Sequence, residues 1–196
     1  MKWIQCAQRR ALGKFSSPAG GRAQPASWSH ADALSARKLE LQLDANGRRV
    51  EVEYHVHPDG VPAAVHAAMD ALFPSGPIVG AEKEWNDGIL YWELSREVDG
   101  YEIEAMFLPD GTLHQLEIGV DPTFVPDAVR TTAAQAVAGA VPDKWEEIRD
   151  GARVLTEYHV KLSRADDRFK VVIAIDGALM AVFREVPAEL ELPVTD

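Results

Sequence analysis

Apolar and polar residues alternate along three pairs of segments, a pattern that predicts three β-hairpins. In the first, Leu39, Leu41 and Leu43 alternate with polar residues, the dipeptide Asn46-Gly47 follows, and the alternation resumes over residues 50–56. Asn-Gly is a strong hairpin signal because both residues tolerate a positive φ. The other two predicted hairpins span residues 101–120 and 169–184, with turns at Asp110-Gly111 and Asp176-Gly177.

Helical spacing of apolar residues replaces this alternation in two places. Val61-Pro62 opens the first predicted helix, which ends before Pro74. Proline suits the first turn of a helix, where its missing N–H leaves no helical hydrogen bond unmade. Val125-Pro126 opens the second helix, which we expect to continue to Pro142. Further strands are predicted at residues 78–85 and 89–97 after the first helix, and at 144–148 and 154–162 after the second.

These segments recur at a nearly fixed period. Five residues between Pro58 and Val65 are repeated 64 positions later, and the hairpin turns at Gly47, Gly111 and Gly177 lie 64 and 66 residues apart. Such a period indicates a duplicated structural unit, here one helix and about four antiparallel strands. The chain then divides into a tail at 1–36, a leading hairpin at 37–57, repeats at 58–121 and 122–186, and a C-terminal tail at 187–196.

The elements together predict an α+β fold with an extended antiparallel sheet, both helices on one face and the other face open. Six aromatic residues are expected to build the core between sheet and helices: Trp85, Trp92, Phe107, Trp145, Phe169 and Phe183. The open face is the predicted binding surface. Its candidate residues are Glu51, Glu53, Tyr91, Glu93, Glu102, Glu104, Glu157, His159 and Lys161.

Six short motifs carry a resemblance to a known group of proteins. They are Val61–Val65, Phe73-Pro74, Ala81–Glu84, Tyr91–Leu94, Glu104–Gly111 and Val125–Val129. With them the chain resembles, over roughly residues 38–186, the PepSY-like proteins related in fold to β-lactamase inhibitor protein (BLIP). The resemblance implies the fold described above and a periplasmic or other extracytoplasmic location. It also implies binding, since the better understood relatives bind or inhibit other proteins.

Charge is distributed unevenly along the 196 residues. The net charge is -11, but residues 1–31 hold five basic side chains and no acidic one. An acidic body repels a phosphate backbone, so nucleic acid is not expected as the partner. The basic tail, with Arg9, Arg10 and Lys14 as candidate docking residues, is interpreted in three ways: as a flexible segment, as a targeting segment, or as an arm that docks on a partner or an anionic membrane surface.

No run of apolar residues approaches the length of a transmembrane helix, and no export signal is visible after Lys2. The single cysteine, Cys6, excludes an intramolecular disulfide and leaves the redox compartment undecided. The sequence also leaves the oligomeric state open.

The sequence gives little evidence for catalytic residues. No serine lies in a nucleophile elbow, and no phosphate-binding or dinucleotide motif is present. His55 and His57, two residues apart on a predicted strand, could share a divalent metal, but the second repeat has Gly119 and Asp121 at their positions. A solvated strand face is the favoured interpretation of this pair, and no cofactor is expected.

Three functional hypotheses follow. The leading one is a noncatalytic protein that binds a protein or peptide through the open face of the sheet. The second is an accessory subunit of a larger assembly, docked by its basic tail on a partner or on an anionic membrane surface. The third, weaker one is a metal-binding protein that uses His55 and His57.

Overall fold

The structure is a computed structural model that describes residues 38–86 and 88–188. Ten strands form one antiparallel sheet, ordered β1 to β10 as they occur in the chain. They are β1 (Leu39–Leu43), β2 (Arg49–His55), β3 (Ile78–Asn86), β4 (Ile89–Val98), β5 (Tyr101–Phe107), β6 (Leu113–Gly119), β7 (Val141–Asp150), β8 (Leu155–Arg164), β9 (Asp167–Ala174) and β10 (Leu179–Glu185). Helices α2 (Ala63–Leu72) and α3 (Asp127–Ala136) follow the short 3-10 turns η1 (Pro58–Gly60) and η2 (Pro122–Phe124).

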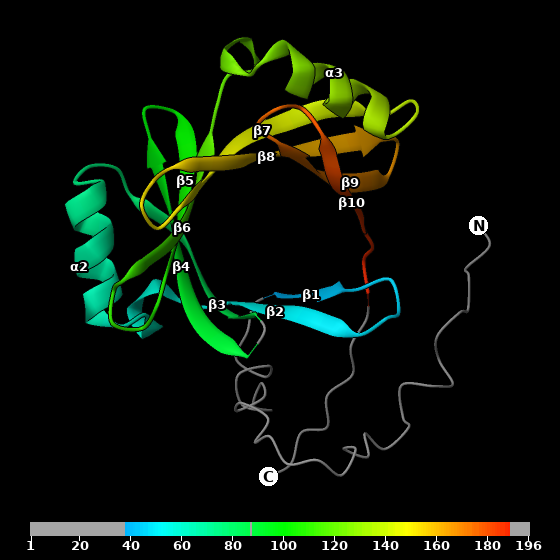
Figure 1. The fold of residues 1–196 in the computed structure, drawn as a ribbon. Coiled ribbons are helices and arrows are strands. Elements are labelled where there is room, and N and C mark those ends of the chain that lie inside the picture. Colours follow the sequence, from blue (N-terminus) through cyan, green and yellow to red (C-terminus); the bar gives the residue numbers. More distant parts are fainter. Residues whose placement is uncertain (1–37, 87, 189–196) are drawn as a thin grey trace, which may run out of the picture.

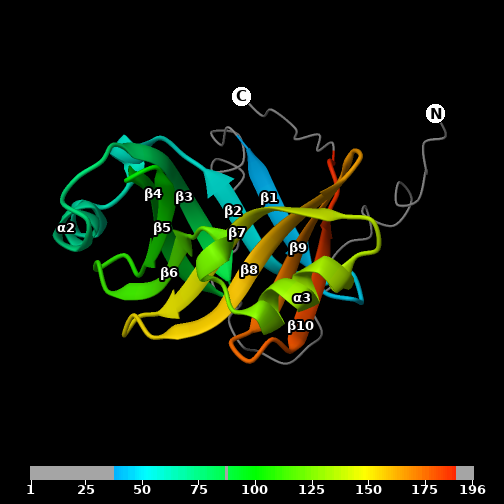
Figure 2. The ribbon, with the colours of Figure 1, turned by 90° about the horizontal axis from the view of Figure 1, so that it is seen from above.

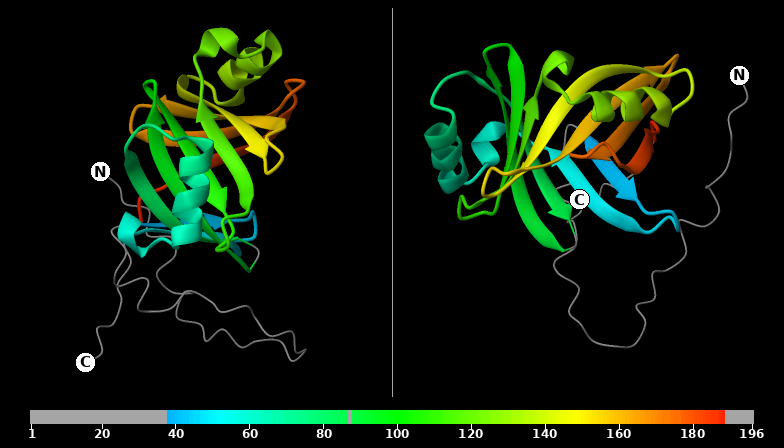
Figure 3. Two further views of the ribbon diagram at one scale, coloured as in Figure 1. Left: turned by 90° about the vertical axis from the view of Figure 1, so that its left-hand side faces the viewer. Right: turned by 45° about the horizontal axis from the view of Figure 1, so that its top comes forward.

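The sheet curls, and both helices lie on its convex side (Figure 1). In the view from above, α2 lies beside β4 and β5 and α3 lies over β9 and β10 (Figure 2), and α2 runs across the outer surface of its strands (Figure 3). Five of the strand pairs contain a register shift. Such irregularities bend a sheet and add to the curvature that strand twist produces. The predicted α+β class, antiparallel sheet and helix placement are confirmed, and the face without helices is concave.

Each helix covers its own hydrophobic core. Val65 and Met69 of α2 pack with Leu94, Phe107 and Leu116 of the strands beneath them. The second cluster joins α3 to β7–β9 and contains Val129, Ala133, Trp145, Tyr158, Val160, Leu162, Phe169, Val171 and Ile173. Alternation along β3 to β9 therefore sends one set of side chains to the side covered by the helices and the other set to the concave face.

Phe107, Trp145 and Phe169 occupy the predicted core, and Trp92 packs against it. The prediction that Phe183 belongs to the core is wrong, because its side chain lines the cavity on the concave face. Its strand partner is Lys170, which also points into that cavity, so the parity of β10 places Phe183 away from α3. Among the described residues, no helix is long and apolar enough to cross a membrane.

The second helix ends earlier than its apolar stripe predicts. Helix α3 stops at Ala136, Val137 is extended with φ of -133°, and the chain turns at Gly139, whose φ is +76°. Pro142 lies within β7 and pairs with Leu162. The residues predicted as the last helical turn therefore lead into the strand, because strand pairing with β8 begins at Val141.

Two hairpin turns rest on the two helices in equivalent ways. A Cβ built on Gly111 would lie 2.7 Å from the Ala64 carbonyl oxygen of α2, and one on Gly177 would lie 2.7 Å from the Ala128 Cβ of α3. Both glycines have a positive φ, so each turn needs both the absence of a side chain and a left-handed backbone. These matching contacts accord with the sequence repeat, while the duplication of the unit stays a prediction.

Gly177→Ala is expected to destabilise the protein by roughly 1–3 kcal/mol more than Gly47→Ala, because overpacking is added to backbone strain. Gly47 has a φ of +75° but nothing within 4 Å of its built Cβ, so it reports strain alone. Urea denaturation of the two variants measures the difference. Equal losses would contradict the proposed contact between turn and helix.

Candidate functional site

The concave face encloses a cavity of about 390 Å³. This volume lies within the range of about 300–1,000 Å³ that is typical of ligand sites. Its lining is drawn from both ends and the middle of the sheet and includes Glu51, Glu53, Glu84, Glu93, Met106, Glu117, His159, Lys170, Val172 and Phe183. The curl of the sheet therefore gathers strands that are distant in sequence around one polar cavity.

Carboxylates dominate the part of this face formed by β2 to β6. Strand register places Glu53 opposite Glu84, Glu82 opposite Glu93, and Glu104 opposite Glu117. Like charges on directly opposed residues repel one another. Among the described residues, Glu53, Glu84, Glu93 and Glu104 form no ion pair with a Lys, Arg or His side chain.

This crowding shifts the protonation of the acidic side chains. Burial, followed by the neighbouring carboxylates, raises the pKa of Glu53 to about 8 and that of Glu82 to about 7. Burial and the charge of Glu117 raise the pKa of Glu104 to about 8. The pKa of Glu93 is raised well above its ordinary value for the same two reasons, with Glu104 as the first charged neighbour. Several of these groups therefore hold protons near neutral pH.

Glu84 is the most enclosed of these carboxylates. It is only 3% exposed, and its Oε1 is buried without a hydrogen-bond partner. Burial and the charge of Glu53 raise its pKa to about 7. An acidic side chain in this position is costly to ionise unless a positive charge comes close to it.

Lys144 and Lys161 lie on the other half of the face and pair with carboxylates. Lys144 Nζ lies 2.7 Å from Glu102 and 2.7 Å from Glu146, and Lys161 Nζ lies 3.3 Å from Glu185. Despite burial, the carboxylates near Lys144 raise its pKa above the ordinary value. The carboxylates near β7 and β8 are thus neutralised by lysines, whereas those on β2 to β5 are crowded together.

His159 stands at the junction of these two halves. Its Nε2 lies 2.9 Å from Glu157 Oε1, and its Nδ1 lies 3.7 Å from Glu117 Oε1. Burial opposes protonation, but the nearby carboxylates of Glu117 and Glu157 prevail and raise the pKa of His159 to about 9. The same contact, against the effect of burial, lowers the pKa of Glu117.

The predicted binding-face residues lie on the concave side, in less open positions than expected. Tyr91 is 6% exposed, with its ring 4.5 Å from that of His114, and His159 is 7% exposed. Strand parity puts Glu51, Glu53, Glu93, Glu102, Glu104, Glu157 and Lys161 on the same side. Whether these residues bind a partner stays a prediction, and the tail residues Arg9, Arg10 and Lys14 lie outside the described residues.

The two candidate metal-binding histidines have separate surroundings. His55 lies between Glu40 and Glu82, at 3.0 and 3.1 Å. His57 accepts a hydrogen bond from the backbone N–H of Asp59 and so caps η1. Asp121 caps η2 in the same way, which accounts for a polar residue at this position in both halves without a metal.

Other cavity residues were outside the sequence prediction. Glu84 and Lys170 are not among the predicted binding-face residues, but both line the cavity. Period-two alternation from Glu82 and from Val172 identifies the side of the sheet on which each lies. Their enclosure depends on the curl of the sheet, for which the local sequence carries no comparable signal.

No family model matches the sequence, and no curated protein matches it. Solved structures show similarity in fold. A protein described as periplasmic, from Bacteroides eggerthii DSM 20697, superposes with a TM-score of 0.51 at 14% identity, covering 63% of this chain and 88% of its own. A DUF2874 family protein from Bacteroides uniformis ATCC 8492 gives 0.50 at 16% identity, covering 63% and 89%.

This chain has a DUF2874-type fold. A BLIP-like protein from Bacteroides fragilis NCTC 9343 is also similar, with a TM-score of 0.47 at 18% identity and coverage of 66% and 89%. The fold assignment rests on the first two structures. At these identities the similarity concerns the fold alone, so any function must be argued from the concave face of this chain.

Proposed function

We propose that this protein is a noncatalytic binding protein whose concave face captures a cationic segment of a protein or peptide. The observation that carries the proposal is the row of crowded carboxylates on β2 to β5, with Glu53 directly opposite Glu84. A cation entering the cavity supplies the charge that these groups lack. Binding is therefore expected to favour their ionised form and to release protons.

The cavity also suits the shape of a lysine or arginine side chain. Met106, Val172 and Phe183 provide apolar surface beside the carboxylates. Long basic side chains place their methylene stems on such surface while the charged end remains among polar groups. The combination of an apolar patch and adjacent acids therefore favours a basic peptide over a small inorganic cation as the ligand of this half of the face.

We also propose that the scaffold arose as a duplicated unit of one helix and about four strands, preceded by a hairpin. The equivalent caps of η1 and η2 and the equivalent contacts of Gly111 and Gly177 support this. On the concave face the crowded carboxylates lie on β2 to β5 and the lysines on β7 to β9, so the two repeats share a backbone arrangement but not a pattern of charge.

Fluorescently labelled hexalysine is a suitable probe. Glu53→Gln combined with Glu84→Gln is expected to weaken its binding at pH 8 at least about tenfold, equivalent to about 1.4 kcal/mol, because two charges facing the ligand are removed. Fluorescence anisotropy measures the dissociation constant.

The matched control carries Asp59→Asn and Asp127→Asn. It loses the same net charge, but both carboxylates are exposed, at 91% and 89%, in η1 and α3. Affinity within about twofold of the unmodified protein is expected for the control. If both double variants lose affinity equally, general charge and not the concave face attracts the peptide.

A further inference from the structure

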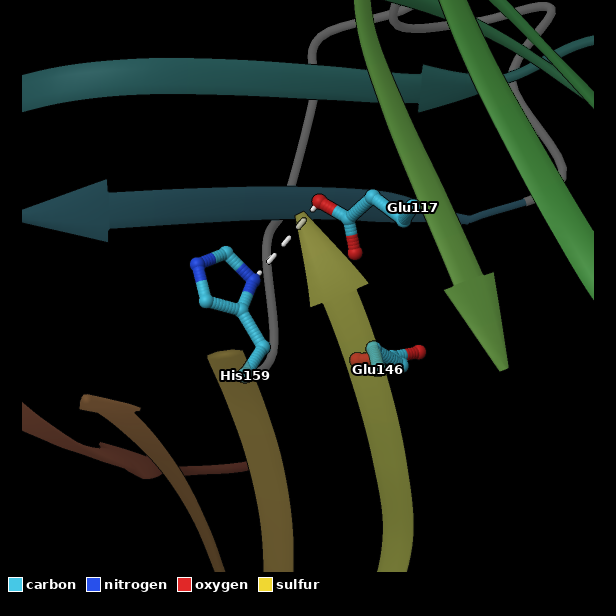
Figure 4. Close-up of side chains that lie close together, drawn as sticks. All are labelled: Glu117, Glu146 and His159. Carbon is cyan, nitrogen blue, oxygen red and sulfur yellow. Dashed lines mark ion pairs between the residues drawn. The ribbon is translucent and has the colours of Figure 1, made fainter. Parts of the chain in front are cut away.

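Three metal-ligating side chains meet on neighbouring strands of the concave face. They are Glu117 of β6, Glu146 of β7 and His159 of β8, and one ligand atom from each lies within 4.8 Å of the other two. Figure 4 shows Glu117 and His159 directed toward each other, with Glu146 beside them. Within the described residues, this is the one group of three or more His, Cys, Asp or Glu side chains that meets this distance.

Two atoms of the group are buried without a hydrogen-bond partner. One is Oε2 of Glu146, a residue that is 2% exposed, and the other is Nδ1 of His159, a residue that is 7% exposed. The Glu117 carboxylate lies 3.7 Å from His159 Nδ1, beyond hydrogen-bond distance. Buried polar atoms nearly always have a hydrogen-bond partner, so these two atoms point to a further ligand between the side chains. Histidine nitrogens and glutamate oxygens are both common metal ligands.

The remaining atoms of the same side chains are held by neighbours. His159 Nε2 lies 2.9 Å from Glu157, and Glu146 Oε1 lies 2.7 Å from Lys144 Nζ. Metal-binding histidines characteristically place their second ring nitrogen against a carboxylate, and metal-binding carboxylates receive hydrogen bonds of their own. The outer contacts thus leave His159 Nδ1 and Glu146 Oε2 without a hydrogen bond, as the candidate ligand atoms.

We propose that Glu117, Glu146 and His159 bind one divalent transition-metal ion, with Zn²⁺ as the representative case. Metal–ligand distances of about 2.0–2.2 Å place the ligands of a tetrahedral ion about 3.3 Å apart. The 3.7 Å between His159 Nδ1 and Glu117 Oε1 is close to this spacing, and all three ligand atoms lie within 4.8 Å of one another, so binding of the ion requires them to move closer together. This site does not depend on the proposed capture of a cationic peptide.

The ligand set also defines the class of ion and the access to it. An imidazole with two carboxylates suits Zn²⁺ and its first-row neighbours, whereas Ca²⁺ and Mg²⁺ prefer oxygen ligands alone. The two carboxylate charges balance the charge of the ion. Glu117 and His159 line the cavity, so the remaining coordination position is accessible to water or to a donor group of a bound molecule.

Isothermal titration of the chelator-treated, full-length protein with Zn²⁺, and separately with Mg²⁺, tests the site. One Zn²⁺ per chain and at least a hundredfold preference over Mg²⁺ are expected. Glu146→Gln and His159→Gln should each weaken Zn²⁺ binding at least tenfold, and His66→Gln, a change on α2, should leave it unchanged. No stoichiometric Zn²⁺, or a loss caused by His55→Gln in place of His159→Gln, would overturn the proposal.

Glu117→Gln provides a second variant if the buried changes prevent folding. Its side chain is 19% exposed, so the amide is tolerated more easily than at Glu146, and the same tenfold loss is expected. Thermal melting of the unmodified protein adds a test without substitution. Saturating Zn²⁺ should raise the melting temperature, since a ligand of the folded state stabilises it, and an unchanged melting temperature would contradict the site.

Discussion

The free energy of unfolding is expected to fall as the pH rises from about 5 to about 8. The pKa values of Glu53, Glu82 and Glu84 in the folded protein are raised to about 8, 7 and 7 from an ordinary value of 4.5. Between these values the folded state holds protons that the unfolded state has released, so each rise in pH favours unfolding. The stabilising contribution is complete below about pH 4.5 and is lost through about pH 7–8.

For Glu84, which is 3% exposed, the loss is on the order of 3 kcal/mol. The groups that face it are Glu53 on β2, Glu82 and Asn86 on its own strand, and Glu117 on β6. Urea denaturation at several pH values measures the slope. A free energy of unfolding that is constant or rises between pH 5 and pH 8 would contradict the burial of these carboxyl groups.

Below about pH 4 the trend reverses. The pKa values of Asp110, Asp121 and Asp167 are lowered by hydrogen bonds, first from the Thr112 backbone, the Thr123 side chain and the Arg164 side chain respectively. Their stabilising effect is present above the ordinary pKa and is lost as the pH falls through the lowered one. Stability is therefore expected to be greatest near pH 5.

The variant with Glu53→Gln and Glu84→Gln is expected to be more stable than the unmodified protein at pH 8, by about 2–3 kcal/mol, and to differ little at pH 5. An amide cannot ionise, so the folded state no longer contains two negative charges that face each other on neighbouring strands. The same variant is expected to lose hexalysine affinity. Gain of stability together with loss of binding is typical of residues kept for function.

Stability of the control with Asp59→Asn and Asp127→Asn should remain within about 0.5 kcal/mol at both pH values, because exposed charges contribute little. A Glu53 and Glu84 double variant that is less stable at pH 8 would show that these carboxylates have partners that hold them ionised. Chemical denaturation and hexalysine anisotropy on the same preparations give both readouts.

Local periodicity predicted most of the fold. Alternation locates the strands and the residues of each face, and from it alone Glu53, Glu93 and Glu104 are candidates for the binding face. The end of α3 was missed because Val137 and Ala140 continue a helical spacing, while in the structure they pack against the core from a loop. Apolar spacing identifies the buried side of a segment and leaves its backbone conformation open.

Curvature and register account for what the sequence could not predict. Tyr91 and Glu84 alternate like residues of a solvated face, but the curl of the sheet encloses both. Glu117, Glu146 and His159 come from three strands, so their meeting depends on the registers of β6, β7 and β8, which include two irregular positions. No short spacing in the chain could identify this group.

The most direct test of cationic capture is an NMR titration of protein labelled with ¹³C at the glutamate side-chain carboxyl carbons, with unlabelled hexalysine at pH 7. The carboxyl signals of Glu53, Glu82 and Glu84 should move toward their ionised positions as the peptide binds, because a nearby cation lowers a raised pKa. Peptide binding that leaves these three signals in place, or that moves only glutamates of the convex side such as Glu147, would contradict the account.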